Sequence, residues 1–123
     1  MILIVDDDPS SRRVFVLQFA RLGYPALAVA SGLEALALIE DDHEFDMVLM
    51  DVRMPPPDGF ETTRLIRQMS EPKCHIPVAG VTAGVLTFTR AQCLEAGMND
   101  LIVKPVSLGI LTTLLKNLGL ALG

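Results

Sequence analysis

Three short apolar runs of this chain each end in charged residues. The runs are residues 1–5, 47–50 and 101–103, and they lead into Asp6-Asp7-Asp8, Asp51 and Lys104-Pro105 respectively. An unbroken apolar run of this length is typical of a strand that is buried on both faces of a parallel sheet. If the three runs are neighbouring strands, their carboxyl ends lie at one edge of the sheet. Acids from two strands and a lysine from a third then converge there.

Helical patterns fill the segments between the strand-like runs. Pro9 suits the first position of a helix and makes Asp8 its N-cap. Ser31 and Asp58 are each followed by a Glu three residues later, which predicts two further helix starts, and a last helix is expected to begin near Ser107. The expected strands are 2–5, 26–30, one within 45–51, 76–82 and 101–103, and the expected helices are 9–22, 31–40, 58–69, 87–96 and 107 onward.

Strict alternation of five strands with five helices predicts an α/β fold. In this fold a five-stranded, doubly wound parallel sheet carries helices on both faces. The 123 residues suit one domain, spanning residues 1–123, and a composition that is 50% hydrophobic can supply its core without disulfides. Ligands of such sheets bind at the carboxyl ends of the strands, where the strand order reverses. The acids and the lysine are expected at those ends.

Composition and charge narrow the class of protein. The net charge is −5 without a basic cluster, which argues against direct binding of nucleic acid. No apolar run reaches the ~18 residues of a membrane span, and no signal peptide pattern is visible, so we expect a cytoplasmic domain without membrane insertion. Cys74 and Cys93 show neither metal-type nor redox-type spacing, and His43 and His75 are expected at the surface.

The converging residues suit phosphoryl chemistry. Asp6, Asp7 and Asp51 would repel one another, and Mg²⁺, which prefers oxygen ligands, would relieve the repulsion. Asp51 could then act as a nucleophile toward phosphorus, because a carboxylate is already ionised near neutral pH. Lys104 would stabilise charge on the transferring phosphoryl oxygens, and Thr82 offers a hydroxyl at the end of the fourth expected strand.

The complete pattern closely resembles the receiver domain of two-component response regulators. The residues that carry the resemblance are Ile4-Val-Asp-Asp-Asp-Pro9, Met50-Asp-Val-Arg-Met-Pro55 with Asp58-Gly59, Val81-Thr-Ala83, and Ala96-Gly-Met-Asn-Asp100 leading to Val103-Lys-Pro105. The resemblance covers essentially the whole chain. It implies a flavodoxin-like fold with the strand order 2-1-3-4-5.

The resemblance also implies a role for each acidic residue of the motif. Asp51 would be the phosphoacceptor. Mg²⁺ would be bound directly by Asp7, and mainly through water by Asp6. Asp51 and the backbone carbonyl of Arg53 would complete its protein ligands. These residues would make the domain assist its own phosphorylation and dephosphorylation, so we do not class it as an enzyme.

Further implications concern the phosphoryl group and its donor. Lys104 would pair with the phosphoryl group, Thr82 would be the switch hydroxyl, and Pro105 would follow a cis peptide bond. The donor would be a phosphohistidine on a sensor histidine kinase or on a histidine phosphotransfer protein. The surface of the fourth helix, fifth strand and fifth helix would be a partner or homodimer face. The chain could be a stand-alone regulator or a receiver cut from a longer protein, and its abrupt apolar ends, Met1-Ile2 and Leu120-Ala-Leu-Gly123, suggest a domain excised from, for example, a hybrid sensor kinase.

Four positions distinguish this chain within the resemblance. Arg53 stands where family members tune the lifetime of the phosphoryl group, and Gly84, its companion position, offers no side chain. Pro56-Pro57 stiffens the loop after the acceptor. Leu101 occupies the place of the family's usual switch aromatic, so the usual pairing of a threonine movement with an aromatic flip is not expected here.

Two other functions compete with a phosphorylatable switch. Asp6-x-Asp8-x-Ser10, with Lys104 as a later lysine, faintly resembles the signature of haloacid dehalogenase-type phosphatases, although Pro9 commits Asp8 to a helix cap. A receiver-like interaction module that is never phosphorylated is the second alternative. Leu101 and the proline pair leave room for it, whereas the complete set of acids, lysine and threonine argues against it.

Overall fold

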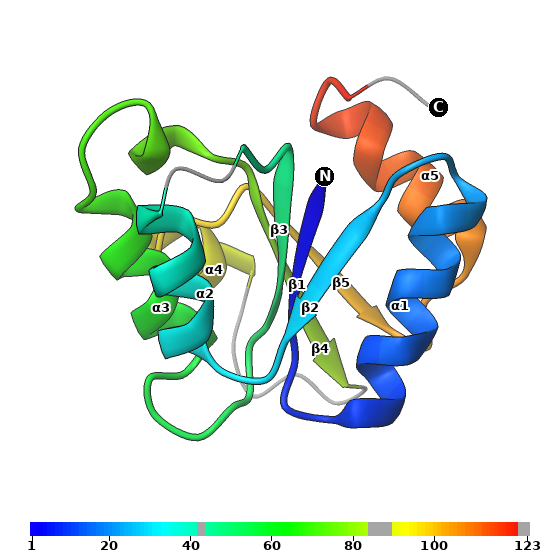
Figure 1. Cartoon of the computed structure of the whole chain (residues 1–123), viewed down its shortest axis with the longest axis horizontal. Coiled ribbons are helices and arrows are strands. Elements are labelled where there is room, and N and C mark those ends of the chain that lie inside the picture. Colours follow the sequence, from blue (N-terminus) through cyan, green and yellow to red (C-terminus); the bar gives the residue numbers. More distant parts are fainter. Residues whose placement is uncertain (42–43, 84–89, 121–123) are drawn as a thin grey trace.

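A computed structural model describes residues 1–41, 44–83 and 90–120. In this part of the chain five parallel strands form one sheet in the order β2-β1-β3-β4-β5 (Figure 1), as the sequence predicted. The strands are β1 (Ile2–Val5), β2 (Ala26–Val29), β3 (Met47–Asp51), β4 (Val78–Ala83) and β5 (Asp100–Lys104). The helices are α1 (Pro9–Arg21), α2 (Gly32–Glu40), α3 (Gly59–Arg67), α4 (Arg90–Glu95) and α5 (Leu108–Asn117), with a short 3₁₀ turn at Lys73–His75.

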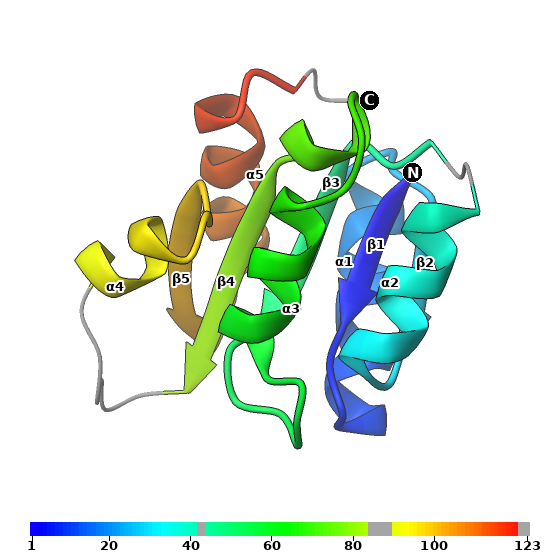
Figure 2. The same ribbon diagram turned by 90° about the vertical axis from the view of Figure 1, so that its left-hand side faces the viewer.

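Helices cover both faces of the sheet. Helices α1 and α5 lie on one face, and α2, α3 and α4 lie on the other (Figures 1 and 2). Side chains alternate between these two layers along a strand. In β1, Ile2 and Ile4 pack with α1 and α5, whereas Leu3 and Val5 pack with α2 and α3. All four side chains are fully buried, so this strand is apolar throughout because both of its faces are core.

The helix starts follow the predicted caps. The Asp8 side chain accepts hydrogen bonds from the Ser10 N–H (3.2 Å) and the Ser11 hydroxyl (3.0 Å), which confirms Asp8 as the N-cap of α1. Asp58 and Glu61 form a complete capping box at α3. At α2, Glu34 accepts instead from the Ala30 N–H, one residue earlier than a capping box requires.

The helix and strand ends differ from expectation by one or two residues. Helix α3 ends at Arg67 rather than near residue 69. Strand β4 begins at Val78 rather than at residue 76, because Ile76 is the C-cap of the 3₁₀ turn and Pro77 has no N–H to donate to the sheet. The expected helix start at residue 87 lies outside the described residues. None of the described helices combines the length and apolar character needed to cross a membrane.

Candidate functional site

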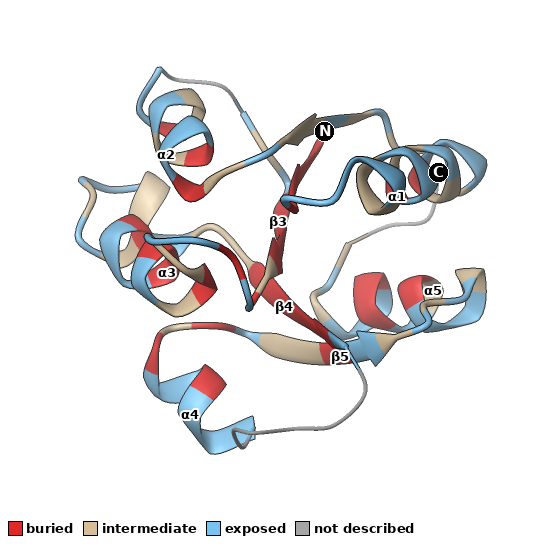
Figure 3. Cartoon of the chain, turned by 90° about the horizontal axis from the view of Figure 1, so that it is seen from below, coloured by how far each residue is buried: buried red, intermediate tan, exposed pale blue. Residues whose placement is uncertain are grey.

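The acids converge at the carboxyl edge of the sheet, which faces the viewer in Figure 3. Val5 and Met50 are paired between β1 and β3, so Asp6 and Asp51 follow side by side. Each of Asp6, Asp7 and Asp51 offers a carboxylate oxygen, and these oxygens lie within 4.8 Å of one another. Asp6 is buried, Asp51 is half-buried and Asp7 is exposed. The group therefore opens from the core toward solvent, as a site for an incoming ion requires.

Lys104 reaches this group from the end of β5, an edge strand of the sheet. Its Nζ donates to Asp6 Oδ2 at 3.2 Å and to the Ser11 hydroxyl at 3.2 Å. Asp6 Oδ1 accepts from the Asp8 N–H at 2.9 Å. Because Asp6 is only 2% exposed, its charge needs these partners. Lys104 thereby provides the positive charge that stabilises the buried Asp6 carboxylate.

The pKa of Asp51 is strongly shifted by its surroundings. Burial raises its pKa to about 7, and the negative charge of Asp6 adds to the shift. A hydrogen bond from the Arg53 N–H to Asp51 Oδ1 (3.1 Å) and the charge of Lys104 oppose it. The raised pKa means that burial, together with the charge of Asp6, outweighs the charge of Lys104 and disfavours the ionised form of Asp51. A bound divalent cation would restore the ionised form of Asp51.

Thr82 lies on the strand beside Asp51. Val81 is paired with Asp51 between β3 and β4, and Thr82 follows it. Thr82 is 2% exposed, and its hydroxyl finds no hydrogen-bond partner among the described residues. A buried hydroxyl without a partner is uncommon in folded proteins. Its hydroxyl therefore has free hydrogen-bonding capacity among the described residues, on the strand next to the acidic group.

Gly59 sets the approach of α3 to the end of β3. A Cβ on Gly59 would overlap the Asp51 carbonyl oxygen and lie 2.7 Å from Val52 Cα. The Gly59 N–H donates to the Val52 carbonyl at 3.1 Å, which closes the loop 52–58. Only a residue without a side chain fits here. The Asp58-Gly59 pair belongs to the sequence motif, but the local pattern does not predict this close packing, because the packing depends on where the end of β3 lies in space.

Leu101 occupies a packed position rather than the mouth of the site. It is paired with Gly80 between β4 and β5, and a Cβ on Gly80 would lie 3.2 Å from Leu101 Cδ1. Its half-buried side chain packs against the core layer formed with α2 and α3. The residue therefore fills space on the α4 side of the sheet, two residues before Val103, which pairs with Thr82.

The structure brings five of the predicted site residues to one edge: Asp6, Asp7, Asp51, Thr82 and Lys104. Arg53 is exposed beside them, and its carbonyl as a metal ligand stays a prediction. The expected cis bond before Pro105 is confirmed. Sequence reasoning missed Ser11 as a partner of Lys104, because nothing in the local pattern distinguishes it from Ser10. Gly84 and His43 lie outside the described residues.

Comparisons with known proteins identify the family of this chain. A family model described as the response regulator receiver domain matches residues 2–116. The sensor histidine kinase RcsC of Escherichia coli (strain K12) is 41% identical over 111 residues, covering 90% of this chain. Histidine kinase 3 of Arabidopsis thaliana is 36% identical over 123 residues, covering 85% of this chain. The chain spans only 11% and 12% of the lengths of these two relatives.

Solved structures show the same fold. The receiver domain of the sensor histidine kinase PA1611 from Pseudomonas aeruginosa PAO1, which has a magnesium ion coordinated in its active site cleft, is 36% identical with a TM-score of 0.85 and 96% coverage of both chains. The chemotaxis protein CheY4 of Vibrio cholerae is 27% identical with a TM-score of 0.85, covering 95% of this chain and 96% of that one. This chain belongs to the family of response regulator receiver domains.

Proposed function

We propose that this receiver domain is a phosphorylatable switch in a two-component phosphorelay, with Asp51 as the phosphoacceptor. The observation that carries the proposal is the convergence of three carboxylates within 4.8 Å with Lys104 bound to the deepest of them. The matched relatives include sensor histidine kinases, which supports a phosphohistidine donor. The donor would belong to such a kinase or to a histidine phosphotransfer protein.

The residues present fit a magnesium ion. Mg²⁺ prefers oxygen ligands, keeps several waters, and typically uses one or two protein carboxylates. Asp7 would bind the ion directly, Asp6 mainly through water, and Asp51 and the Arg53 carbonyl would complete the protein ligands. The raised pKa of Asp51 supports a need for a cation at this site. When bound, the ion would neutralise negative charge on the acceptor and on the incoming phosphoryl oxygens.

Phosphoryl transfer would use the chain's own side chains in distinct roles. An ionised oxygen of Asp51 attacks phosphorus, the phosphorus–nitrogen bond of the donor breaks, and its electron pair remains on the imidazole. The product is an acyl phosphate on Asp51. Lys104 and the Thr82 hydroxyl would donate to phosphoryl oxygens, and both lie at the edge where that group arrives. We therefore propose an acceptor that promotes its own modification rather than an enzyme acting on a separate substrate.

The surface of α4, β5 and α5 is our proposed partner or homodimer face. Val103 and Ile110 are exposed apolar residues on these elements. Arg90 forms an ion pair of 2.8 Å with Asp100 and ties α4 to β5. A change at Lys104, the last residue of β5, would reach this face directly. We also propose a cytoplasmic location, no membrane insertion and no direct nucleic-acid contact, as the charge and composition favour.

The haloacid dehalogenase-type alternative is not favoured. It needs Asp8 as a general acid, yet hydrogen bonds from Ser11 and Ser10 lower the pKa of Asp8. Asp8 is committed to capping α1, and the family match covers almost the whole chain. The remaining alternative, an interaction module that is never phosphorylated, would not require the complete acidic group with its lysine.

Incubation with acetyl phosphate and Mg²⁺, followed by intact-mass measurement, tests the proposal. Wild-type protein should gain one phosphoryl group, and Asp51→Asn should gain none. Asp8→Asn is the matched control: asparagine caps a helix as well as aspartate does, so this variant should be phosphorylated normally. A mass gain that persists in Asp51→Asn, or that survives removal of Mg²⁺ by a chelator, would contradict the proposal.

A further inference from the structure

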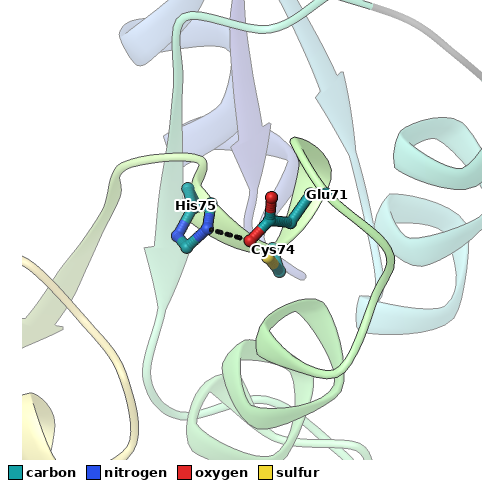
Figure 4. A group of neighbouring side chains, drawn as sticks. All are labelled: Glu71, Cys74 and His75. Atoms are coloured by element: carbon teal, nitrogen blue, oxygen red, sulfur yellow. Dashed lines mark hydrogen bonds and ion pairs between the residues drawn. The ribbon is translucent and has the colours of Figure 1, made fainter.

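A second cluster of side chains that could ligate a metal lies at the opposite edge of the sheet. Glu71, Cys74 and His75 stand in the connection between α3 and β4, around the 3₁₀ turn (Figure 4). This connection is near the top of Figure 1, at the amino ends of the strands, whereas the carboxyl edge is at the bottom. A carboxylate oxygen, a sulfur and a ring nitrogen of the three residues lie within 4.8 Å of one another.

We propose that Glu71, Cys74 and His75 form a binding site for a borderline divalent transition metal, with Zn²⁺ as the best fit. Thiolate and imidazole are the ligands that Zn²⁺ prefers, and a carboxylate commonly accompanies them. Mg²⁺ takes oxygen ligands instead, so this group would not compete for the ion of the acidic site. Three protein ligands leave one tetrahedral position for water or an external ligand.

The backbone that carries these ligands is held firmly. The His75 N–H donates to the Pro72 carbonyl at 3.1 Å, which closes the turn. The Arg67 guanidinium donates to the carbonyls of Cys74 (2.9 Å) and Ile76 (2.6 Å) and thus fastens the turn to α3. Lys73 Nζ donates to the Glu40 carbonyl at 2.8 Å, which fastens it to α2. Cys74 and His75 therefore start from a fixed turn, as a selective site requires, and Glu71 directly precedes that turn at Pro72.

The side chains have the reach to close around an ion. His75 Nε2 and Glu71 Oε1 are 3.2 Å apart, close to the ~3.3–3.8 Å between ligand atoms of a tetrahedral zinc with bonds of about 2.0–2.3 Å. The side chains of His75 and Glu71 are 70% and 81% exposed, so rotation toward the Cys74 sulfur meets little resistance. An ordinary exposed ion pair between His75 and Glu71 would explain their contact, but it would not involve the sulfur.

No pattern in the sequence predicts this group. Glu-x-x-Cys-His is not a familiar metal-binding spacing, and neither cysteine has a second cysteine nearby in the sequence. The 3₁₀ turn Lys73–His75 is what brings positions 74 and 75 close to position 71. His75 is exposed, as the sequence predicted, and exposure is what makes it accessible to an ion.

Titration of the reduced full chain with Co²⁺, a spectroscopic substitute for Zn²⁺, tests the proposal. We expect a thiolate-to-cobalt charge-transfer band that saturates at one ion per chain and disappears when Zn²⁺ is added. Cys74→Ser should lose the band. Cys93→Ala is the matched control, because Cys93 is 1% exposed within the core and lies outside the cluster. That variant should keep the band.

Two further variants separate the ligands from the scaffold. His75→Ala and Glu71→Gln should each weaken Co²⁺ binding at least tenfold while leaving the far-ultraviolet circular dichroism of the metal-free protein unchanged. Asp51→Asn should bind Co²⁺ through the cluster normally, so failure here is distinguishable from failure at the acidic site. A band retained in Cys74→Ser, no band in the wild type, or saturation at half an ion per chain with dimer formation would overturn the proposal.

Discussion

Lys104 at the end of β5 donates to the buried carboxylate of Asp6 at the end of β1, at 3.2 Å, across the ends of the two strands between them. This bond connects the edge of the sheet that bears the proposed partner face to the deepest acid of the site. A phosphoryl group on Asp51 would compete with Asp6 for the same ammonium group. Movement of the Lys104 ammonium group from Asp6 to the phosphoryl group would therefore transmit phosphorylation directly to β5.

Replacement of Lys104 tests whether its bond to Asp6 stabilises the fold. In Lys104→Met the buried Asp6 loses its cation, so we expect the free energy of unfolding without metal to fall by about 2 kcal/mol. Lys116→Met removes an exposed lysine from α5 and should change stability by less than ~0.5 kcal/mol. Urea unfolding at pH 7 measures both. Equal stability of the two variants would show that Asp6 does not depend on Lys104.

The stability of the metal-free domain should depend on pH through Asp51. Its pKa is about 7 in the folded protein and 3.8 as the reference value, so the folded state holds the proton more tightly. The stability contribution of Asp51 is therefore greatest below pH 3.8 and is lost as the pH rises through about 7. The partial exposure of the group limits the effect to about 1–2 kcal/mol, below the full conversion of the shift.

Asp51→Asn isolates this contribution. The variant should be more stable than the wild type at pH 8 without metal, and the difference should vanish near pH 4. Saturating Mg²⁺ should abolish the advantage at pH 8, because the wild type then gains a ligand that the variant binds poorly. Thermal unfolding at both pH values, with and without Mg²⁺, provides the measurement. An advantage that is the same at both pH values would assign the effect to something other than titration.

Gly59 should tolerate no side chain. In Gly59→Ala the new Cβ would overlap the Asp51 carbonyl oxygen and press on Val52, so α3 or the end of β3 must shift. We expect a loss of about 3 kcal/mol and slower phosphorylation of Asp51. Gly109→Ala is the control: its Cβ would lie 3.7 Å from the Ser107 hydroxyl, and alanine favours the helix by up to ~1 kcal/mol. Similar chemical denaturation midpoints for both variants would refute the close approach.

Much of the fold could be predicted from local sequence patterns. An apolar run buried on both faces predicted β1, and caps at Asp8, Asp58 and Ser107 predicted three helix starts. These signals are local because a cap satisfies N–H groups two or three residues away. The predicted start of β4 was wrong by two residues. Ile76 is apolar enough for a strand, but it is the C-cap of the 3₁₀ turn Lys73–His75, and Pro77 has no N–H to donate.

The site was predictable where the sheet itself places the residues. Asp6 and Asp51 follow paired strand residues, so parallel pairing alone brings them together. The partners of Lys104 were not predictable in the same way. Ser11 is 93 residues from Lys104, and its hydroxyl accepts from the lysine because the first turn of α1 lies at the carboxyl edge of the sheet. Contacts that depend on the packing of a helix against a distant strand leave no periodic signal in the sequence.

Arg67 holds together the region that carries the proposed zinc ligands. Its guanidinium donates to the carbonyls of Gly97 (2.8 Å), Cys74 (2.9 Å) and Ile76 (2.6 Å) and to the Asn99 side chain (2.9 Å). Burial lowers the pKa of Arg67, yet an arginine remains charged throughout the physiological range. Four acceptors bound to one half-buried cation form a link between α3, the 3₁₀ turn and the start of β5.

Arg67→Met should remove that link. We expect a loss of about 3 kcal/mol, because several part-buried carbonyls lose a charged donor together. Arg64→Met, an exposed change on the same helix, should cost less than ~0.5 kcal/mol. Hydrogen exchange should accelerate in residues 72–78 of the Arg67 variant and not of the Arg64 variant. Under the zinc proposal, Co²⁺ affinity should also fall in Arg67→Met alone, since the ligand backbone loses its anchor. Unchanged exchange and affinity would show that the turn is held by Pro72 and Lys73 without the arginine.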